Sequence, residues 1–173
     1  MGMRIELENL EGRKGVFAHV YQPEELNPVD ERVRLTGPAE VNGQVRLEGY
    51  EVFVEGHVET RAQVECDRCL KPVELPVSID FALEYISGAD YESGSNAALS
   101  EEEMSVSVFD GAAIDVDEIV KEQILLTLPA RTLCRDDCKG ICPECGIDRN
   151  TGECNCTPNE VDPRWAALKD LKQ

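Results

Sequence analysis

The sequence has little that points to catalysis. It contains no glycine-rich phosphate loop, no HExxH metalloprotease motif and no GxSxG nucleophile motif. Its only two histidines, His19 and His57, fall in segments with strand character, so a Cys–His or Ser–His catalytic pair is poorly supported. With 35 acidic residues, any proposed pair of catalytic carboxylates is unspecific. We therefore predict neither an enzymatic activity nor a small-molecule substrate.

Long apolar runs are also missing. No segment approaches the ~18 consecutive apolar residues that a membrane-spanning helix needs. The first residues, Met1 to Ile5, do not contain the apolar stretch of a secretory signal. We therefore expect a cytoplasmic protein with no membrane partner. In that compartment, clustered cysteines are more often metal ligands than disulfides.

Positive charge is scarce, and its distribution is uneven. The chain has 17 Lys and Arg against 35 Asp and Glu, a formal net charge of -18. Residues 1–128 carry 10 basic against 27 acidic residues, a net of -17, whereas residues 129–173 carry 7 against 8. Because phosphates repel so acidic a body, we expect any RNA contact near the C-terminal tail or through a basic protein partner. The alternative is that the acidic residues only keep the protein soluble and monomeric.

Apolar and polar residues alternate over three long segments, which predicts strands with one buried face. These strands are expected at residues 39–47, 50–65 and 73–86. Weaker strand signals lie around Ile5 and from Val16 to Tyr21. The Pro-containing residues 22–32 are typical of a loop, and so are the small, acidic residues 87–104.

The apolar residues fall on odd-numbered positions in the first segment, on even-numbered positions in the second and on odd-numbered positions in the third. This change predicts two hairpins. A two-residue turn at Glu48-Gly49 would place Leu47 opposite Tyr50. The second hairpin would place Val64 opposite Val73. In both registers the apolar rows coincide, and a slip by one residue would turn a whole row outward. The pattern therefore predicts a three-stranded antiparallel meander.

One helix is predicted at residues 115–128. Asp115 can cap it, with Glu118 as the capping-box partner, and Pro129 ends it. Its apolar stripe suits the inner face of the sheet. The expected fold class is therefore α+β, a mainly antiparallel sheet with one packed helix.

We predict two parts, an antiparallel β domain at residues 1–130 and a cysteine-rich, zinc-binding tail at residues 131–173. The tail is expected to end in a short helix that begins near Asp162-Pro163 and presents Trp165 on one side. This helix could dock on its own domain, which we prefer, or bind a partner.

Eight cysteines carry the clearest chemical signal. Six lie in the tail and two form a CxxC at the tip of the second hairpin, where we expect them to face solvent. The eight are Cys66, Cys69, Cys134, Cys138, Cys142, Cys145, Cys154 and Cys156. Cys142-Pro-Glu-Cys145-Gly146 has the form of a zinc knuckle, since two thiolates separated by two residues reach one ion and glycine lets the backbone turn. We predict that all eight bind zinc, as one or two ions.

The division of the ligands is open at this point. In chain order, the first four cysteines would form one tetrahedral site and the last four a second, local site. The competing arrangement takes one site from the tail alone and leaves Cys66 and Cys69 without partners. A thiol-redox role also stays open, because Arg68 could lower the pKa of a neighbouring thiol, although no helix follows that CxxC.

Several motifs together resemble the YceD-like family, whose members are named large ribosomal RNA subunit accumulation proteins. They are CDRCL at 66–70, the helix ending in LP at 128–129, CRDDCKGICPECG at 134–146, Asn150, CNC at 154–156 and DPRWAAL at 162–168. The resemblance covers about residues 40–171. It implies a role in the production or maturation of large-subunit ribosomal RNA in bacteria and chloroplasts, with no known enzymatic activity. After CPxCG the family usually has Asn-Leu-Asn, where this chain has Ile147-Asp148-Arg149-Asn150.

Two functions are consistent with these patterns. The first is a bacterial ribosome-biogenesis factor that acts as a non-catalytic, zinc-containing adaptor. Its expected partners are precursor large-subunit ribosomal RNA, basic ribosomal proteins, or both. Four basic residues interleaved with the cysteines could contact phosphates, namely Arg131, Arg135, Lys139 and Arg149. The second is a cytosolic thiol-redox or zinc-dependent enzyme that uses the CxxC motifs, which would need a reactive thiol or an open coordination position.

Overall fold

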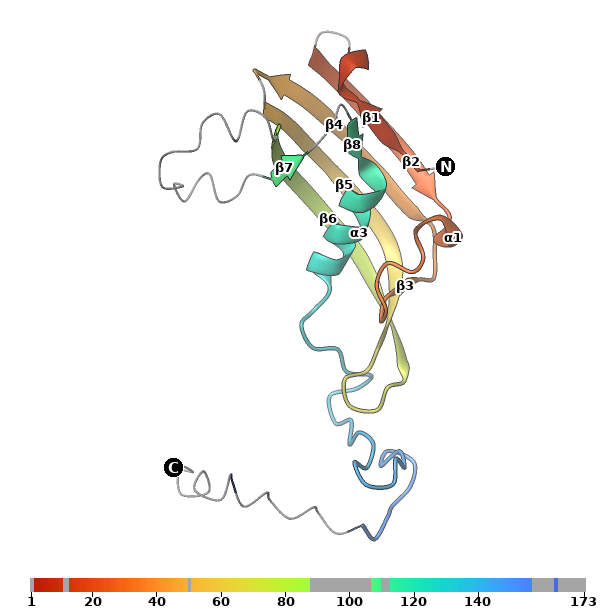
Figure 1. The fold of residues 1–173 in the computed structure, drawn as a ribbon. Helices are drawn as coiled ribbons and strands as arrows, with labels where there is room; N and C mark the ends of the chain where they lie inside the picture. Colours follow the sequence, from red (N-terminus) through yellow and green to blue (C-terminus); the bar gives the residue numbers. More distant parts are fainter. Residues whose placement is uncertain are drawn as a thin grey trace.

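The computed structural model describes residues 2–10, 13–49, 51–87, 107–109, 113–156 and 164. Its centre is a six-stranded sheet with the spatial order β2-β4-β5-β6-β7, and β3 pairs with β5 beside this path. The strands are β2 (Lys14–Tyr21), β3 (Arg34–Leu35), β4 (Ala39–Glu48), β5 (Glu51–Glu65), β6 (Pro72–Ser87) and β7 (Ser107–Phe109). A separate antiparallel pair joins β1 (Arg4–Glu6) to β8 (Ala113–Asp115). Figure 1 shows the long strands running the length of the body.

The predicted meander forms the middle of this sheet. β4, β5 and β6 are consecutive antiparallel neighbours. The second hairpin has the predicted register, with Val64 opposite Val73 and Val58 opposite Ile79. Alternation sets this register because only one face of each strand is buried. The prediction is confirmed and extended, since β2 adds an antiparallel edge strand and β7 pairs with β6 in parallel.

The predicted turn of the first hairpin was wrong by one position. Glu48 pairs with Glu51, and Leu47 lies opposite Val52 instead of Tyr50. Gly49 has φ +68°, and the first loop position of a tight hairpin favours glycine for this conformation. The change moves the pairing by two residues, so the inward row remains inward.

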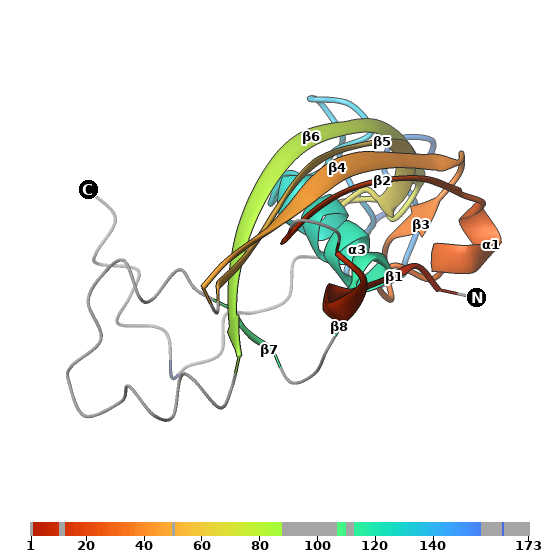
Figure 2. The same cartoon turned by 90° about the horizontal axis from the view of Figure 1, so that it is seen from above.

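The concave face of the sheet holds the core and the helix α3 (Val116–Thr127). Figure 2 shows the sheet arching over α3. The buried side of the helix includes Ile119, Val120 and Ile124, and it packs against valines of the inward strand rows. The Asp115 carboxylate accepts hydrogen bonds from the backbone N–H groups of Asp117 and Glu118, as expected of an N-cap. The predicted helix and its position are thus confirmed.

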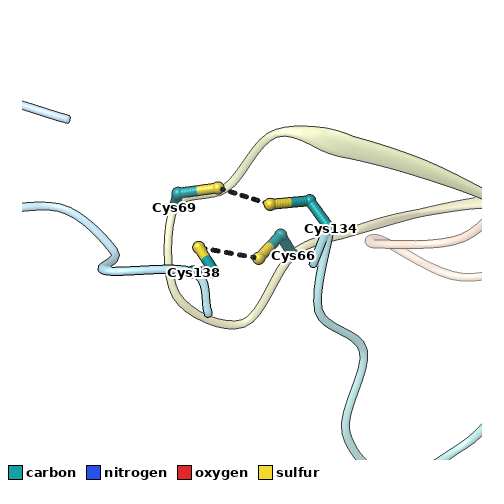
Figure 3. A group of neighbouring side chains, drawn as sticks. All are labelled: Cys66, Cys69, Cys134 and Cys138. Atoms are coloured by element: carbon teal, nitrogen blue, oxygen red, sulfur yellow. Dashed lines mark hydrogen bonds between the residues drawn. The ribbon is translucent and has the colours of Figure 1, made fainter. Parts of the chain in front are cut away.

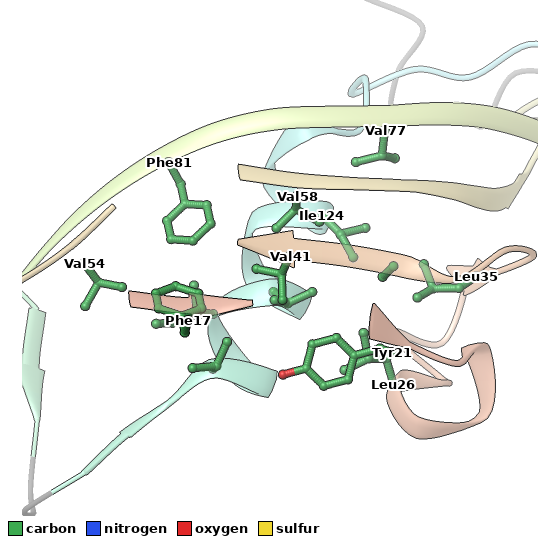
Figure 4. Packing of buried hydrophobic residues seen from close by; sticks show 14 of the residues in the cluster. Phe17, Tyr21, Leu26, Leu35, Val41, Val54, Val58, Val77, Phe81 and Ile124 are labelled. Atoms are coloured by element: carbon green, nitrogen blue, oxygen red, sulfur yellow. The ribbon is translucent and has the colours of Figure 1, made fainter. Parts of the chain in front are cut away.

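Two aromatic rings fill space that two glycines leave open. Gly43 and Gly56 face each other across β4 and β5. A Cβ on Gly43 would lie 2.5 Å from Phe17 Cζ, and one on Gly56 would lie 2.6 Å from Phe81 Cζ. Figure 4 shows the rings of Phe17 and Phe81 within the buried cluster. The glycines in the inward rows are therefore packing positions for these rings.

A partly buried polar contact joins the first turn of α3 to β2. The Tyr21 hydroxyl donates a 2.7 Å hydrogen bond to Asp117 Oδ1, and the backbone N–H of Met3 donates to the same oxygen at 2.8 Å. Burial and the neighbouring carboxylate raise the pKa of Tyr21 above its usual range. The tyrosine therefore stays protonated and keeps donating to Asp117.

The segments outside the long strands are only partly as predicted. Residues 22–32 are not wholly a loop, because Pro23–Leu26 form the short helix α1, with Pro23 in its first turn and a capping box between Gln22 and Glu25. Leu7–Asn9 form a 3-10 turn after β1. The acidic segment 88–106 and the predicted helix from Asp162 lie outside the described residues, except for Arg164.

The β5–β6 hairpin places the functional region. It extends beyond the end of α3, and its tip meets the cysteine-rich residues that follow the helix (Figure 1). The Asp67 backbone N–H donates to Thr132 O at 2.9 Å, and the Thr132 N–H donates to Asp67 Oδ2 at 2.6 Å. This reciprocal pair holds the start of the tail against the hairpin tip.

Candidate metal centres

The eight cysteines gather in two groups of four. The first centre consists of Cys66, Cys69, Cys134 and Cys138, and the second of Cys142, Cys145, Cys154 and Cys156. Within each group all four sulfur atoms lie within 4.8 Å of one another. This matches the division in chain order and not the alternative that leaves Cys66 and Cys69 without partners. Both groups could hold a metal ion.

The first centre joins two distant parts of the chain. The Cys69 and Cys134 sulfurs lie 3.5 Å apart, and the Cys66 and Cys138 sulfurs lie 3.9 Å apart. Figure 3 shows the four side chains pointing toward one another, two from the hairpin tip and two from the tail. The hairpin tip is a tight turn in which the N–H of Leu70 donates to Cys66 O at 2.9 Å.

The expectation of a solvent-facing CxxC was wrong. Cys66 is completely buried and Cys69 is 6% exposed. The tail covers them, because Arg68 Nη1 donates to Cys138 O at 2.6 Å and the Ile141 N–H donates to Arg68 O at 3.0 Å. The prediction considered the hairpin tip alone and did not account for the tail that packs over it.

A glycine allows the tail to approach so closely. Gly140 has φ +74°, and a Cβ at this position would lie 2.8 Å from the backbone oxygen of Arg68. Both the backbone conformation and the close approach therefore require the absence of a side chain. In the sequence, the only sign of this approach is a glycine between the ligand cysteines Cys138 and Cys142.

The electrostatics of the first centre favour thiolates beside a cation. Burial raises the pKa of Cys66, but N–H donors from Arg68, Cys134 and Cys69 outweigh it and lower the pKa to about 6. The hydrogen bond with Cys69 and desolvation raise the pKa of Cys134 to about 12. Negative charges on neighbouring sulfurs repel one another, which opposes the ionisation of all four thiols together. A divalent ion among the four sulfurs removes this repulsion.

The second centre is a local knuckle. The N–H of Gly146 donates to Cys142 O, and the N–H of Cys142 donates to Ile147 O, both at 2.9 Å. Gly146 has φ +72°, and a Cβ on it would meet no atom within 4 Å, so only the turn itself requires glycine there. The N–H groups of Cys145 and Glu144 lower the pKa of Cys142 to about 6. This is the environment expected of a ligand thiolate.

The four basic residues predicted to contact RNA are all exposed, but they are not equivalent. Arg149 Nη2 donates to Cys142 Sγ at 3.5 Å, and Arg135 Nη2 donates to Asn150 Oδ1 at 2.8 Å. Lys139 contributes its backbone N–H to Asn150 Oδ1 at 2.8 Å, which leaves its ammonium group outside that contact. Arg135 and Arg149 therefore support the centres in addition to carrying charge.

Sequence reasoning missed the polar residues around the sulfurs. Asn150 Nδ2 donates to Cys138 Sγ at 3.4 Å, and Lys71 Nζ pairs with Asp148 Oδ2 at 2.7 Å. Lys71 and the hydrogen bond with Asn150 help to hold the pKa of Asp148 down to about 2. Spacing did not indicate these contacts, because Lys71 and Asp148 are far apart in the chain and because the contact of Asn150 with Cys138 depends on the fold of the tail.

A serine, a histidine and an aspartate also meet on the outer face of the sheet. His57 Nδ1 lies 2.7 Å from Asp80 Oδ1, and His57 Nε2 lies 3.4 Å from Ser78 Oγ. The Asp80 side chain is 93% exposed. It therefore differs from the buried carboxylate that orients the histidine of a hydrolytic triad.

The chain is similar to several known proteins. A sequence model of the family described as "Large ribosomal RNA subunit accumulation protein YceD" matches residues 54–172. An uncharacterized protein of Mycobacterium tuberculosis is 32% identical over 69% of this chain and 55% of its own length. The protein YlbN of Bacillus subtilis, also uncharacterized, is 27% identical over 90% of this chain and 86% of its own.

A plant relative carries a functional name. The chloroplastic large ribosomal RNA subunit accumulation protein YCED homolog 1 of Arabidopsis thaliana is 23% identical over 79% of this chain and 49% of its own length. The chain thus spans about half the length of this protein and of the mycobacterial relative. No solved structure matches it. Among the described residues, no helix has the length and apolar character to cross a bilayer.

Proposed function

Because the chain belongs to the YceD family of large ribosomal RNA subunit accumulation proteins, we propose that it supports the accumulation of that RNA as a non-catalytic, zinc-containing adaptor. The observation that carries the proposal is the pairing of all eight cysteines into two four-sulfur centres. Four thiolates saturate a tetrahedral ion, so neither centre leaves a coordination position for a substrate or an activated water.

Zinc is the metal that suits these centres best. Thiolate sets of four select zinc or an iron–sulfur cluster, and the CPEC-Gly knuckle with its amide donors is typical of structural zinc. The first centre fixes the tail to the hairpin tip, and the second folds the tail around itself. Both roles are structural, and the zinc ions supply folding energy instead of reactivity.

The acidic body points to basic partners. Residues 1–128 carry a net charge of -17, which disfavours direct contact with RNA and favours proteins rich in Lys and Arg, such as ribosomal proteins. In the nearly neutral tail, Arg131 and Lys139 are exposed and lie next to the first centre. We propose that these two residues make limited phosphate contacts while the body binds a basic protein.

The RNA contact is tested by reversing charge without disturbing the centres. Arg131→Glu with Lys139→Glu should weaken binding to a transcript of precursor large-subunit RNA. The log–log dependence of binding on salt should flatten by up to ~0.7–0.9 for each phosphate that the tail no longer neutralises. Arg135 and Arg149 are left unchanged because they bond to Asn150 and Cys142. Equal binding by the parent and the variant would refute the RNA contact of the tail.

A charge-matched control uses the body of the protein. Lys14→Glu with Arg34→Glu reverses two exposed charges on β2 and β3, outside the cysteine-rich tail. If this pair weakens RNA binding as much as the tail pair, only net charge matters. Zinc content should be two ions per chain in all three proteins.

The thiol-enzyme alternative has one observation in its favour. The pKa of Cys66 is lowered to about 6, which would make a reactive thiolate if the sulfur were free and accessible. Titration of native protein with a thiol reagent separates the two functions. The adaptor predicts no reactive thiols until a chelator removes the zinc. Rapid modification of Cys66 in zinc-loaded protein, or cleavage of precursor RNA by the purified protein alone, would overturn the adaptor function.

A further inference from the structure

Two neighbouring residues donate to different metal centres. Arg149 Nη2 donates to Cys142 of the second centre at 3.5 Å. Asn150 Nδ2 donates to Cys138 of the first centre at 3.4 Å. Both residues lie in the segment between Cys145 and Cys154, whose two ends are ligands of the second centre. One short loop therefore touches both sets of sulfurs.

Both the oxygen and the nitrogen of the Asn150 side-chain amide make hydrogen bonds near the first centre. Its Oδ1 accepts from the backbone N–H of Lys139 and from Arg135 Nη2, both at 2.8 Å. Lys139 and Arg135 lie next to the ligands Cys138 and Cys134 of the first centre. Its Nδ2 also donates to Asp148 Oδ1 at 2.7 Å, which fixes the amide orientation from within the loop. The side chain thus positions the ligand segment of the first centre from a loop that belongs to the second.

Two more contacts hold the same loop in place. The N–H of Arg149 donates to Gly140 O at 2.9 Å, and Asp148 Oδ2 pairs with Lys71 Nζ at 2.7 Å. Lys71 follows the ligand Cys69 closely at the hairpin tip. The loop therefore contacts both halves of the first centre, the hairpin tip and the tail.

We propose that the two centres are thermodynamically coupled, so that metal in the second centre raises the metal affinity of the first, with Asn150 as the main positioning residue. This rests on the metal binding proposed above. Metal at Cys145 and Cys154 fixes both ends of the loop and so holds Asn150 against Cys138. Without that metal the loop must be ordered when the first centre fills, which weakens the binding. By reciprocity, metal in the first centre strengthens the second by the same factor.

The expected size of the effect follows from the hydrogen bonds of Asn150. Removing a hydrogen-bond partner of a metal ligand commonly lowers metal affinity by roughly 10- to 100-fold. Asn150→Ala removes the donor to Cys138 together with the acceptor for Lys139 and Arg135. Thr151→Ala is the matched control, since the exposed Thr151 hydroxyl donates to Asp148 O within the same loop at 3.2 Å and, among the described residues, bonds to neither set of sulfurs.

Cadmium is the probe for the experiment. NMR of cadmium-loaded protein gives one resonance for each thiolate centre, so competition with a chelator measures each affinity separately. Asn150→Ala should weaken the first centre by roughly 10- to 100-fold, while Thr151→Ala leaves it within about threefold. Disabling the second centre with Cys145→Ser and Cys154→Ser should weaken the first centre to a similar extent, even though all of its own ligands remain.

A double-variant comparison distinguishes coupling from simple damage. In the protein without a second centre, Asn150→Ala should weaken the first centre little further, because Asn150 is no longer held in place. The coupling is refuted if the losses of affinity at the first centre caused by the two changes multiply. It is also refuted if the first centre keeps its affinity when the second is disabled. In both cases metal binding itself still stands. If the parent binds fewer than two cadmium ions, the proposed metal binding itself fails.

Discussion

A contrast between two glycines in the tail tests the contact between the hairpin tip and the cysteine-rich segment. Gly140 and Gly146 have nearly the same backbone conformation, with φ of +74° and +72°. They differ in their surroundings. A Cβ at residue 140 would lie 2.8 Å from Arg68 O and 3.3 Å from Arg68 Cβ, whereas a Cβ at residue 146 meets nothing within 4 Å.

The magnitudes follow from this difference. Alanine in a left-handed conformation costs about 1–2 kcal/mol. Because metal binding folds the tail, this cost lowers metal affinity directly, and Gly146→Ala should weaken the second centre by roughly 5- to 30-fold. Gly140→Ala has the same cost and adds about 1–3 kcal/mol for the forced contact with a backbone oxygen. It should weaken the first centre by roughly 30- to 4,000-fold.

Chelator competition followed by cadmium NMR measures both affinities in the same samples. Gly140→Ala should weaken its centre at least about fivefold more than Gly146→Ala weakens its own, since the extra cost is at least about 1 kcal/mol and ~1.4 kcal/mol corresponds to a factor of ten. Equal weakening of the two centres would mean that Gly140 does not lie against Arg68, and the docking of the tail on the hairpin tip would be refuted.

Three further changes probe the second centre, the polar contact in the core and the packing of the helix. Cys142→Ser should unfold the tail around the second centre while the sheet stays folded, because metal supplies the folding energy of this local segment; disappearance of the sheet amide signals in NMR would contradict this. Tyr21→Phe removes the 2.7 Å hydrogen bond to the Asp117 carboxylate and should lower the free energy of unfolding by roughly 1.5–3 kcal/mol in a urea titration; an unchanged midpoint would argue against that hydrogen bond. Ile124→Ala opens a cavity at a completely buried position and should lower stability by roughly 2–5 kcal/mol. Leu126→Ala, at a position 70% exposed, is the control and should change stability by less than about 0.5 kcal/mol.

Much of the β body could be predicted from alternation alone. The pairing of Val64 with Val73 follows from parity, because any odd slip would expose the apolar rows. A shift of two residues leaves every side chain on the same face, so alternation cannot exclude it. For this reason the register of the first hairpin differs from the predicted one by two residues. The preference of Gly49 for a positive φ at the first loop position was the information that could have corrected it.

For the cysteines, chain order and a four-ligand requirement suggested the two groups, but spacing did not exclude the arrangement that leaves Cys66 and Cys69 without partners; the positions of the sulfurs decide between them. The burial of Cys66 and Cys69 was not predictable in this way, since it depends on the packing of residues 132–141 over the hairpin tip. Asn150 was noted only as part of a motif. Its hydrogen bond to Cys138 depends on where the knuckle loop lies in space, and local sequence does not specify that.

The first centre also joins segments that are far apart in the chain. Cys69 and Cys134 are 65 residues apart in the sequence, so a metal that holds both closes a long loop. By the chain-entropy relation used for disulfides, closing a loop of this length costs an unfolded chain about 4 kcal/mol, so we expect the four sulfurs to assemble only once the β body has folded. The second centre closes only its own short segment. Because loop-closure entropy grows slowly, each doubling of the chain between Cys69 and Cys134 would change it by only about 0.6 kcal/mol. The entropic cost of closing this loop therefore depends little on the length of the chain that connects the hairpin to the tail.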